Sequence, residues 1–494
     1  MDKVQYVHYY EHTENEHEQK LMLQKDDGEQ QQSNLKHPDT LFLYFSIISG
    51  IFLSASTGIL MTWSSPAVAL LSANNTYINP IGRPIAKVEI TMLLGIPQLC
   101  SLLGSLALPK CADLIGRKRI LHFLSVGMLI TTVGLALSNT VKLLITFLTI
   151  YSFLLNGVLP ILLIYVLEIC EEHNRIKHSC FIIVGLTLGQ MYSYSIGSFL
   201  SFKYFTLVLG IPIALFVIFC FFLVESPTYL MIKENIDECK KALWKLRSNK
   251  SQSEIERDFT AIKNSVSMDK TSDELFIIGI FTRRELRVGI FWAMIPILTN
   301  VLSGVPMFLS LTPPIFQKIQ IVCSPKITAI LAGVKQVIGG IHISYTLGTS
   351  GRKVRLLISS LGIGVSIAIL GTIFYLDHIQ SRLIYTVPWL PFVIFAVYGI
   401  FYSVGVGPIP LAVTSELFSP KVRSSALAFI VTISSIFSAI TTFGFPFLVN
   451  IMGMYWCLWI FAICSFVGFG LIFYCLPELK GKSLLELQET LRNY

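Results

Sequence analysis

The chain has 494 residues, of which 53% are hydrophobic and 14% charged, and its formal net charge is +8. Soluble globular proteins carry about 25% charged residues, so this composition excludes an ordinary soluble protein and indicates that lipid is part of the solvent. The modest positive charge does not indicate a nucleic-acid partner, because its placement along the chain is better explained by orientation in a membrane.

The first segment, residues 1–39, is polar and rich in Glu, Gln, Lys and His. It contains no apolar core of a signal peptide, so we expect the first apolar run to act as its own membrane anchor. We therefore predict that residues 1–39 form a cytoplasmic N-terminal tail.

Apolar runs of about 20 residues, the length that spans a bilayer core, follow in two groups of six. We predict an all-α membrane protein with twelve transmembrane helices in two six-helix pseudo-repeats. The first bundle covers residues 40–224 and the second covers 289–476; cytoplasmic linker helices cover 225–288, and a cytoplasmic tail covers 477–494. The runs begin near Thr40, Val88, Arg119, Val141, Ser179, Tyr204, Gly289, Lys326, Val354, Tyr385, Ser424 and Met452.

The linker carries the sequence Cys-Lys-Lys-Ala-Leu-Trp-Lys-Leu-Arg at residues 239–247. Leu243, Trp244 and Leu246 stand beside cations there, which predicts an amphipathic helix on the membrane surface or against a bundle. We find no Walker loop, which disfavours ATP-driven transport, and no nucleophile, metal cluster or acid/base pair at membrane depth. We therefore expect no enzyme activity, no cofactor and no metal.

The placement of Lys and Arg tests this map independently. With the N-terminus inside, the predicted cytoplasmic segments carry most of the 38 Lys and Arg residues. By the positive-inside rule, both termini are then cytoplasmic.

Three short signals recur in both halves at the same helix ends, which indicates a duplicated unit. A Gly-Arg-Lys triplet follows the second and eighth helices, a Glu precedes an Arg by the same spacing after the fourth and tenth, and a Glu follows the sixth and twelfth. An Arg–carboxylate contact across the halves is charge-assisted and can hold the cytoplasmic side shut; the alternative is that the cations only keep these loops inside. The candidate gate residues are Asp113, Arg117, Glu168, Arg175, Glu225, Arg352, Glu416, Arg423 and Glu478.

These motifs, together with Gly-Pro-Ile-Pro at 407–410 and Pro-Glu-Leu-Lys-Gly at 477–481, resemble the sugar porter family of the major facilitator superfamily. Within that family, Trp-Ser-Ser-Pro at 63–66 resembles the insect facilitated trehalose transporter-like branch. The resemblance implies alternating access, a small-molecule solute bound at mid-membrane between the halves, and a plasma-membrane location.

The resemblance weakens where a sugar would bind. The family's Gln pair in the seventh helix is Asn300-Val301 here, its later Asn is Pro306, and its tenth-helix Trp is Leu411. Amides both donate to and accept from sugar hydroxyls, so their loss reduces discrimination for a sugar. The remaining candidates for lining a solute site, each with helix–helix hydrogen bonding as its alternative role, are Gln190, Tyr194, Asn300, Ser303 and Gln336.

Two further residues bear on coupling. Proton-coupled relatives carry an Asp in the first helix two residues before a Gly, whereas Ser56 precedes Gly58 here, which favours facilitated diffusion. Lys335 is a full charge near the centre of a predicted helix, which is costly in lipid. It would meet an anionic substrate or a paired carboxylate; the alternative is that its side chain snorkels to the membrane surface or that the predicted helix bounds are shifted. We expect facilitative transport of a sugar such as trehalose or a hexose; a transporter-like sensor, a non-transporting paralogue and a porter of another small solute are the alternatives.

Asn74-Asn75-Thr76 is a glycosylation sequon in the first predicted outside loop. In cells that glycosylate, we expect Asn74→Gln and Thr76→Ala each to abolish the glycosidase-sensitive mobility shift of the chain, whereas Thr76→Ser keeps it. A surface-expressed wild-type chain without glycan would contradict the predicted acceptor.

Overall fold

The computed structural model describes residues 39–171, 174–197, 199–269, 283–308, 351–381, 387, 389–407, 409–418 and 420–478. Every regular element within these ranges is an α-helix, which confirms the predicted helical class. In this part of the chain, nine helical stretches are long and apolar enough to cross a membrane, and two shorter apolar helices accompany them. The full count of twelve stays a prediction, because the eighth predicted span lies outside the described residues.

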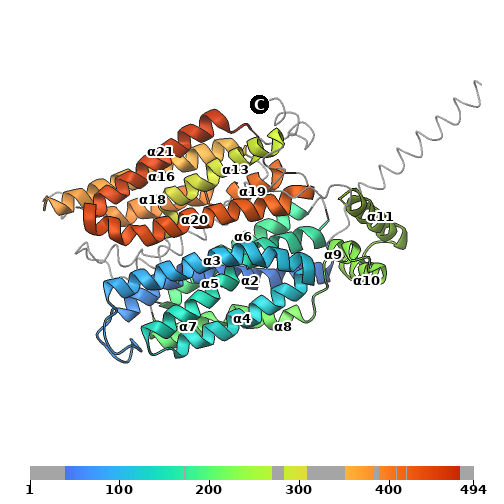
Figure 1. Cartoon of the computed structure of the whole chain (residues 1–494), viewed down its shortest axis with the longest axis horizontal. Helices are drawn as coiled ribbons and strands as arrows, with labels where there is room; N and C mark the ends of the chain where they lie inside the picture. Colours follow the sequence, from blue (N-terminus) through green and yellow to red (C-terminus); the bar gives the residue numbers. More distant parts are fainter. Residues whose placement is uncertain are drawn as a thin grey trace, which may run out of the picture.

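The helices of the first half form one bundle (Figure 1). They are α2 (Leu41–Leu71), α3 (Lys87–Ile115), α4 (Arg117–Leu137), α5 (Val141–Ile169), α6 (Arg175–Gly197), α7 (Phe202–Leu209) and α8 (Ile211–Cys220). The last two divide a single apolar run at Gly210, and Pro212 lies in the first turn of α8, where a missing N–H costs no helical hydrogen bond.

The helices of the second half form another bundle, which lies above the first in Figure 1. They are α13 (Arg284–Leu302), α16 (Arg352–His378), α18 (Leu390–Val404), α19 (Ile409–Leu417), α20 (Pro420–Met452) and α21 (Met454–Cys475). Two of the predicted spans contain interruptions, the first of them in the run that Pro408 and Pro410 already marked as one that could be broken. One lies between α18 and α19, and the other is the bend at Gly304 (φ 78°) after α13.

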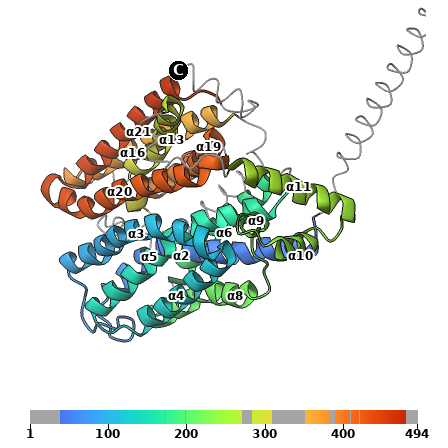
Figure 2. The ribbon, with the colours of Figure 1, turned by 45° about the vertical axis from the view of Figure 1, so that its right-hand side comes forward.

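The linker helices stand at one end of the molecule (Figures 1 and 2). They are α9 (Pro227–Ile232), α10 (Ile236–Leu246) and α11 (Gln252–Asp269), and they enclose a small apolar core of their own. Leu243 of α10 is fully buried in that core, whereas Trp244 is 46% exposed. The amphipathic pattern therefore serves packing within the linker on one side of α10.

Close packing of α2 on α6 organises the first bundle. A methyl group on Gly58 would overlap the carbonyl oxygen of Leu186, and one on Gly189 would overlap the carbonyl oxygen of Ala55. Small residues allow such close backbone approach between helices in lipid, where burial of apolar surface does not drive association. The two helices therefore form a tight pair within the bundle.

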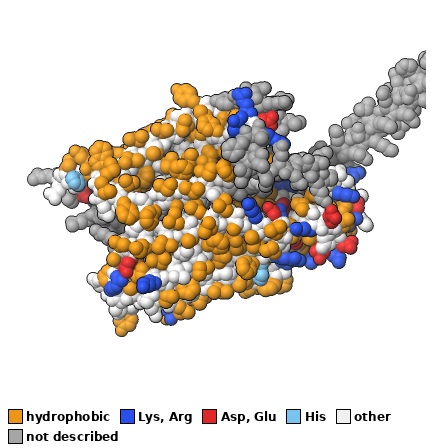
Figure 3. Space-filling view, viewed as in Figure 1, with side chains coloured by type: hydrophobic (Ala, Val, Ile, Leu, Met, Phe, Trp, Pro, Cys, Tyr) orange, Lys and Arg blue, Asp and Glu red, His pale blue; other side chains and the backbone are white. Residues whose placement is uncertain are grey.

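The outer faces of both bundles are apolar. Figure 3 shows hydrophobic side chains along the length of both bundles, whereas most of the Lys, Arg, Asp and Glu side chains gather at the end that carries the linker helices and a smaller group lies at the opposite end. Large apolar side chains such as Phe221 (68% exposed) and Ile463 (61% exposed) are open on these faces. Soluble monomers rarely expose so large an apolar surface, so this belt is the lipid-facing surface of a membrane protein.

A seam of hydrogen bonds joins the two halves along α3 and α20. The hydroxyls of Ser105 and Thr432 lie 3.2 Å apart, and Gln98 Nε2 donates to Ser438 Oγ at 3.4 Å. Asn156 of α5 donates to Ser435 Oγ on α20 at 3.3 Å. Short hydroxyl and amide bonds of this kind hold apolar helices in register without full charges.

Candidate functional site

A carboxylate caps the start of α4, at the end of the molecule that carries the linker helices. Gly116, with φ 116°, makes the sharp turn from α3 into α4. Glu225 Oε1 accepts the N–H of Lys118 at 2.8 Å, and its Oε2 accepts the N–H of Arg119 at 3.4 Å. The first N–H groups of a helix have no partner within the helix, and its positive end favours an anion, so Glu225 acts as a cap on the backbone.

The second half repeats this arrangement. Glu478, which follows α21, accepts the N–H of Arg352 at the start of α16 at 3.0 Å. A Cβ at Gly351 would lie 2.5 Å from Glu478 Oε2, the same separation as between a Cβ at Gly116 and Glu225 Oε2. Glycine before each helix leaves room for the carboxylate over the first turn, and at Gly116 the positive φ favours glycine as well.

Arg117 pairs with carboxylates of its own half. Its Nη2 lies 2.9 Å from Asp113 Oδ1, its Nε lies 3.2 Å from Glu168 Oε2, and its side chain is only 8% exposed. The guanidinium also lies over the ring of Tyr229 at 5.2 Å from the centroid, so it links the bundle to α9. All of these partners belong to the first half or to the linker. The expected ion pairs between the two halves therefore stay a prediction.

The other predicted gate residues are placed less fully. Arg175 Nε donates to the carbonyl of Cys170 at 3.4 Å, which closes the turn between α5 and α6. Glu416 lies on α19 and Arg423 on α20, and their side chains lie outside the described part of the chain.

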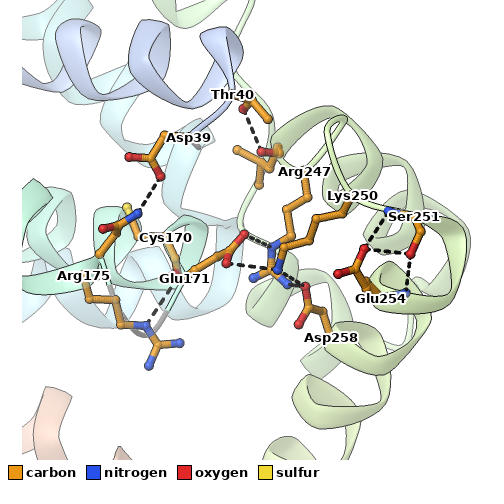
Figure 4. A network of polar contacts seen from close by, with 12 residues as sticks. Asp39, Thr40, Cys170, Glu171, Arg175, Arg247, Lys250, Ser251, Glu254 and Asp258 are labelled. Carbon is orange, nitrogen blue, oxygen red and sulfur yellow. Dashed lines mark hydrogen bonds and ion pairs between the residues drawn. The ribbon is translucent and has the colours of Figure 1, made fainter. Parts of the chain in front are cut away.

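A network that the sequence analysis missed ties the linker to the first bundle (Figure 4). Arg247 pairs with Asp258 and lies 3.9 Å from Glu171, and Lys250 Nζ lies 3.0 Å from Glu171 Oε2 and 3.2 Å from Asp258 Oδ2. Glu171 comes from the turn between α5 and α6, whereas the other three belong to the linker. No spacing in the sequence relates Glu171 to residues so much later in the chain.

The start of α2 joins the same region. Thr40 caps α2 by accepting the N–H of Leu43 at 3.1 Å, and its hydroxyl donates to the carbonyl of Leu246 at the end of α10 at 2.8 Å. Asp39 accepts from Asn174 at 2.8 Å and lies 3.1 Å from Nε2 of His178, whose ring is buried. Asp39 is the last residue of the predicted polar tail, and no role was predicted for it.

Two solute-site candidates lie on one face of α6. Gln190 is 1% exposed, its Nε2 makes only a 3.8 Å contact with the sulfur of Met61, and its Oε1 has no hydrogen-bond partner among the described residues. Tyr194, one turn further along, belongs to the apolar core formed mainly by the second half. The contact with Met61 places the amide of Gln190 against α2 of its own half.

The candidates in the seventh span are already hydrogen-bonded. Asn300 Nδ2 donates to the carbonyl of Val406 at 2.9 Å, and Ser303 Oγ donates to the carbonyl of Asn300 at 2.9 Å. Gln336 and Lys335 lie outside the described residues. The structure therefore brings Gln190 and Tyr194 together and gives Asn300 and Ser303 partners within the protein.

The predicted glycosylation site lies in an exposed loop after α2. Asn74 and Thr76 are both exposed. The loop is held by Asn79, whose Nδ2 donates to the carbonyls of Leu71 and Arg83 at 2.7 Å each. The sequon is thus presented on an ordered turn.

The fold matches that of solved transporter structures. The proton:xylose symporter XylE bound to 6-bromo-6-deoxy-D-glucose superposes with a TM-score of 0.72 and 20% sequence identity, covering 91% of this chain and 99% of that one. The partially occluded inward open conformation of XylE from E. coli gives a TM-score of 0.72 at 19% identity, covering 90% of this chain. The chain therefore shares the fold of these two structures.

The family model described as sugar (and other) transporter matches residues 5–491, so the chain belongs to this family. Among characterised relatives, the probable metabolite transport protein CsbC of Bacillus subtilis (strain 168) is 24% identical, covering 92% of this chain and 94% of that relative. The facilitated trehalose transporter Tret1 is 24% identical in Polypedilum vanderplanki and 25% in Bombyx mori, each covering 91% of this chain and, respectively, 89% and 88% of the relative. The sugar porter resemblance read from the motifs is confirmed, as is the expectation that the chain is a transporter and not an enzyme.

Replacing Arg117 tests the charge cluster at the start of α4. Arg117→Gln leaves Glu168 largely buried without its cation, so we expect a loss of about 3 kcal/mol of stability. The measurement is the midpoint of thermal unfolding of the detergent-purified protein. Unfolding is monitored by the fraction of protein that remains monodisperse after heating. Arg119→Gln, at an exposed position on the same helix, is the control and should leave the midpoint unchanged. Equal midpoints for the two variants would show that the pairing with Glu168 contributes nothing.

Proposed function

We propose that this chain carries a sugar, trehalose or a hexose, across the plasma membrane by facilitated diffusion. The observation that supports it most directly is the buried amide of Gln190, whose Oε1 has no hydrogen-bond partner among the described residues. A buried amide without partners costs about 1–3 kcal/mol, a cost that a solute hydroxyl would remove. The chain thus keeps one strong hydrogen-bonding group buried where α6 meets α2, one turn from Tyr194.

The surroundings of Gln190 suit a sugar ring with one polar edge. Ser193, on the next turn, is also buried, and its hydroxyl has no partner among the described residues. Tyr194 adds an aromatic face beside these two polar groups. Apolar walls with a few convergent polar groups are the usual composition of small-molecule sites. Gln336 and Ser303 complete the proposed lining from the second half.

The absence of a titratable group in the first span supports uniport. Residues 41–71, which form α2, include no acidic or basic residue. Ser56 donates its hydroxyl to the carbonyl of Phe52 at 3.0 Å, so the position of the family's proton-coupling Asp carries a group that only stabilises its own helix. We propose that net flux follows the solute gradient alone.

The proposed orientation places both termini, the linker of residues 225–288 and the tail of 477–494 in the cytoplasm. The gathering of charged side chains around the linker end agrees with it, because Lys and Arg mark the cytoplasmic side. The exposed Asn74 loop then faces outside. Lys335 remains a candidate for contact with an anionic solute.

Uptake in oocytes that express the chain tests the proposal. We expect saturable uptake of labelled trehalose, glucose or fructose above water-injected controls, unaffected by a protonophore. Gln190→Leu should raise KM about tenfold or more, because a solute hydroxyl loses its buried partner. Thr187→Ala is the matched control, since Thr187 lies on the same helix and bonds the carbonyl of Val184.

A verified surface protein with no uptake of any sugar would contradict sugar transport. Solute-dependent quenching of protein fluorescence without flux would instead favour the transporter-like sensor, and uptake abolished by the protonophore would favour symport.

A further inference from the structure

The break between α18 and α19 leaves backbone N–H and C=O groups without the hydrogen bonds that a continuous helix would give them. The α18 helix ends at Val404 and α19 begins at Ile409, and the intervening Val406 is fully buried. In the membrane interior no water is available to such groups, so each must find a partner in the protein. Broken helices in some transporters use these freed groups to bind ions or solute.

Side chains from two other helices form hydrogen bonds with the backbone N–H and C=O of Val406. Ser359 of α16 accepts the N–H of Val406 at 2.9 Å and donates its own hydroxyl to the carbonyl of Phe401 at 2.6 Å. Asn300 of α13 donates to the carbonyl of Val406 at 2.9 Å. Ser359 is fully buried, so its two bonds are shielded from competition with water.

The local backbone fits this arrangement closely. A Cβ at Gly405 would lie 2.5 Å from the carbonyl oxygen of Arg355 and 2.7 Å from Cβ of Ser359, so glycine lets α16 approach the break. The N–H of Gly407 bonds the carbonyl of Tyr402 at 3.0 Å. The amide of Asn300 also interacts with the side chain of Tyr402. Both backbone groups of Val406 and the N–H of Gly407 are thus satisfied by the protein.

We propose that Ser359 and Asn300 are positioning residues, whose hydrogen bonds to the α18–α19 break form a pin that holds it on α16 and α13. Asn300 serves this contact and does not bind the solute. The hydrogen bonds of Ser359 and Asn300 do not depend on the function proposed above. Their expected effect on turnover rests on that proposed transport function. With these bonds in place, α19 keeps a fixed orientation toward α18 and α13, and neither backbone polar group of Val406 is open to an ion or solute. Loosening the pin changes how fast the transporter turns over and leaves solute affinity nearly unchanged.

The first test is hydrogen exchange of the full-length protein in detergent or nanodiscs, read on the peptide that contains Val406. Ser359→Ala removes both bonds with little change in volume, and we expect exchange there to be about tenfold faster. Ser366→Ala is the matched control, because Ser366 is also buried on α16 but bonds only the carbonyl of Gly362 in its own helix. Exchange equal to that of Ser366→Ala would overturn the pin. This reading needs no transport activity.

The second test separates turnover from affinity. Per molecule at the surface, Ser359→Ala and Asn300→Leu should each lower the maximal uptake rate about fivefold or more while KM stays within about twofold. Asn300→Leu with a raised KM and an unchanged rate would show that Asn300 binds the solute, and would overturn its assignment. If the wild-type chain shows no flux but Ser359→Ala still accelerates exchange, the pin stands and the proposed function fails.

Discussion

The backbone hydrogen bonds of a membrane protein constrain everything else in this structure, because lipid offers no partner to an N–H or C=O that leaves a helix. At the starts of α4 and α16 and at the break between α18 and α19, another part of the chain supplies that partner. Glu225 and Glu478 bond the first turns of α4 and α16 in the two halves. Ser359 and Asn300 bond the interruption between α18 and α19.

These caps belong to a connected layer of charged groups at the end of the molecule that carries the linker helices. Glu225 reaches α4 from the chain that leads into the linker, Arg117 pairs with Asp113 and Glu168, and Tyr229 of α9 packs on the same guanidinium. The Arg247 and Lys250 contacts with Glu171 add a second attachment of the linker to the first bundle. The linker helices therefore move with the first half wherever these ion pairs hold, and α3 and α20 form the seam along which the two halves meet.

Much of the fold could be predicted from the sequence, because long apolar runs and the repeated Gly-Arg-Lys triplets follow local rules. The role of Glu225 could be predicted only in part: its repetition showed that it matters, but its bonds to the N–H groups of Lys118 and Arg119 depend on how α8 ends beside α4. Ser359 gave no signal, since it is one serine among several in an apolar helix. Asn300 was assigned to the solute by family position, and only the path of α18 and α19 reveals its contact with Val406.

We propose that this family member moves a sugar down the concentration gradient of that sugar without a coupling ion. The most direct measurement is counterflow in liposomes that contain the purified chain, with unlabelled trehalose or hexose inside, tracer outside, and proton and sodium gradients collapsed by ionophores. A facilitative transporter will accumulate tracer transiently above its equilibrium level. Accumulation that appears only when a proton gradient is imposed, or none with any sugar while the protein is folded and monodisperse, would contradict the claim.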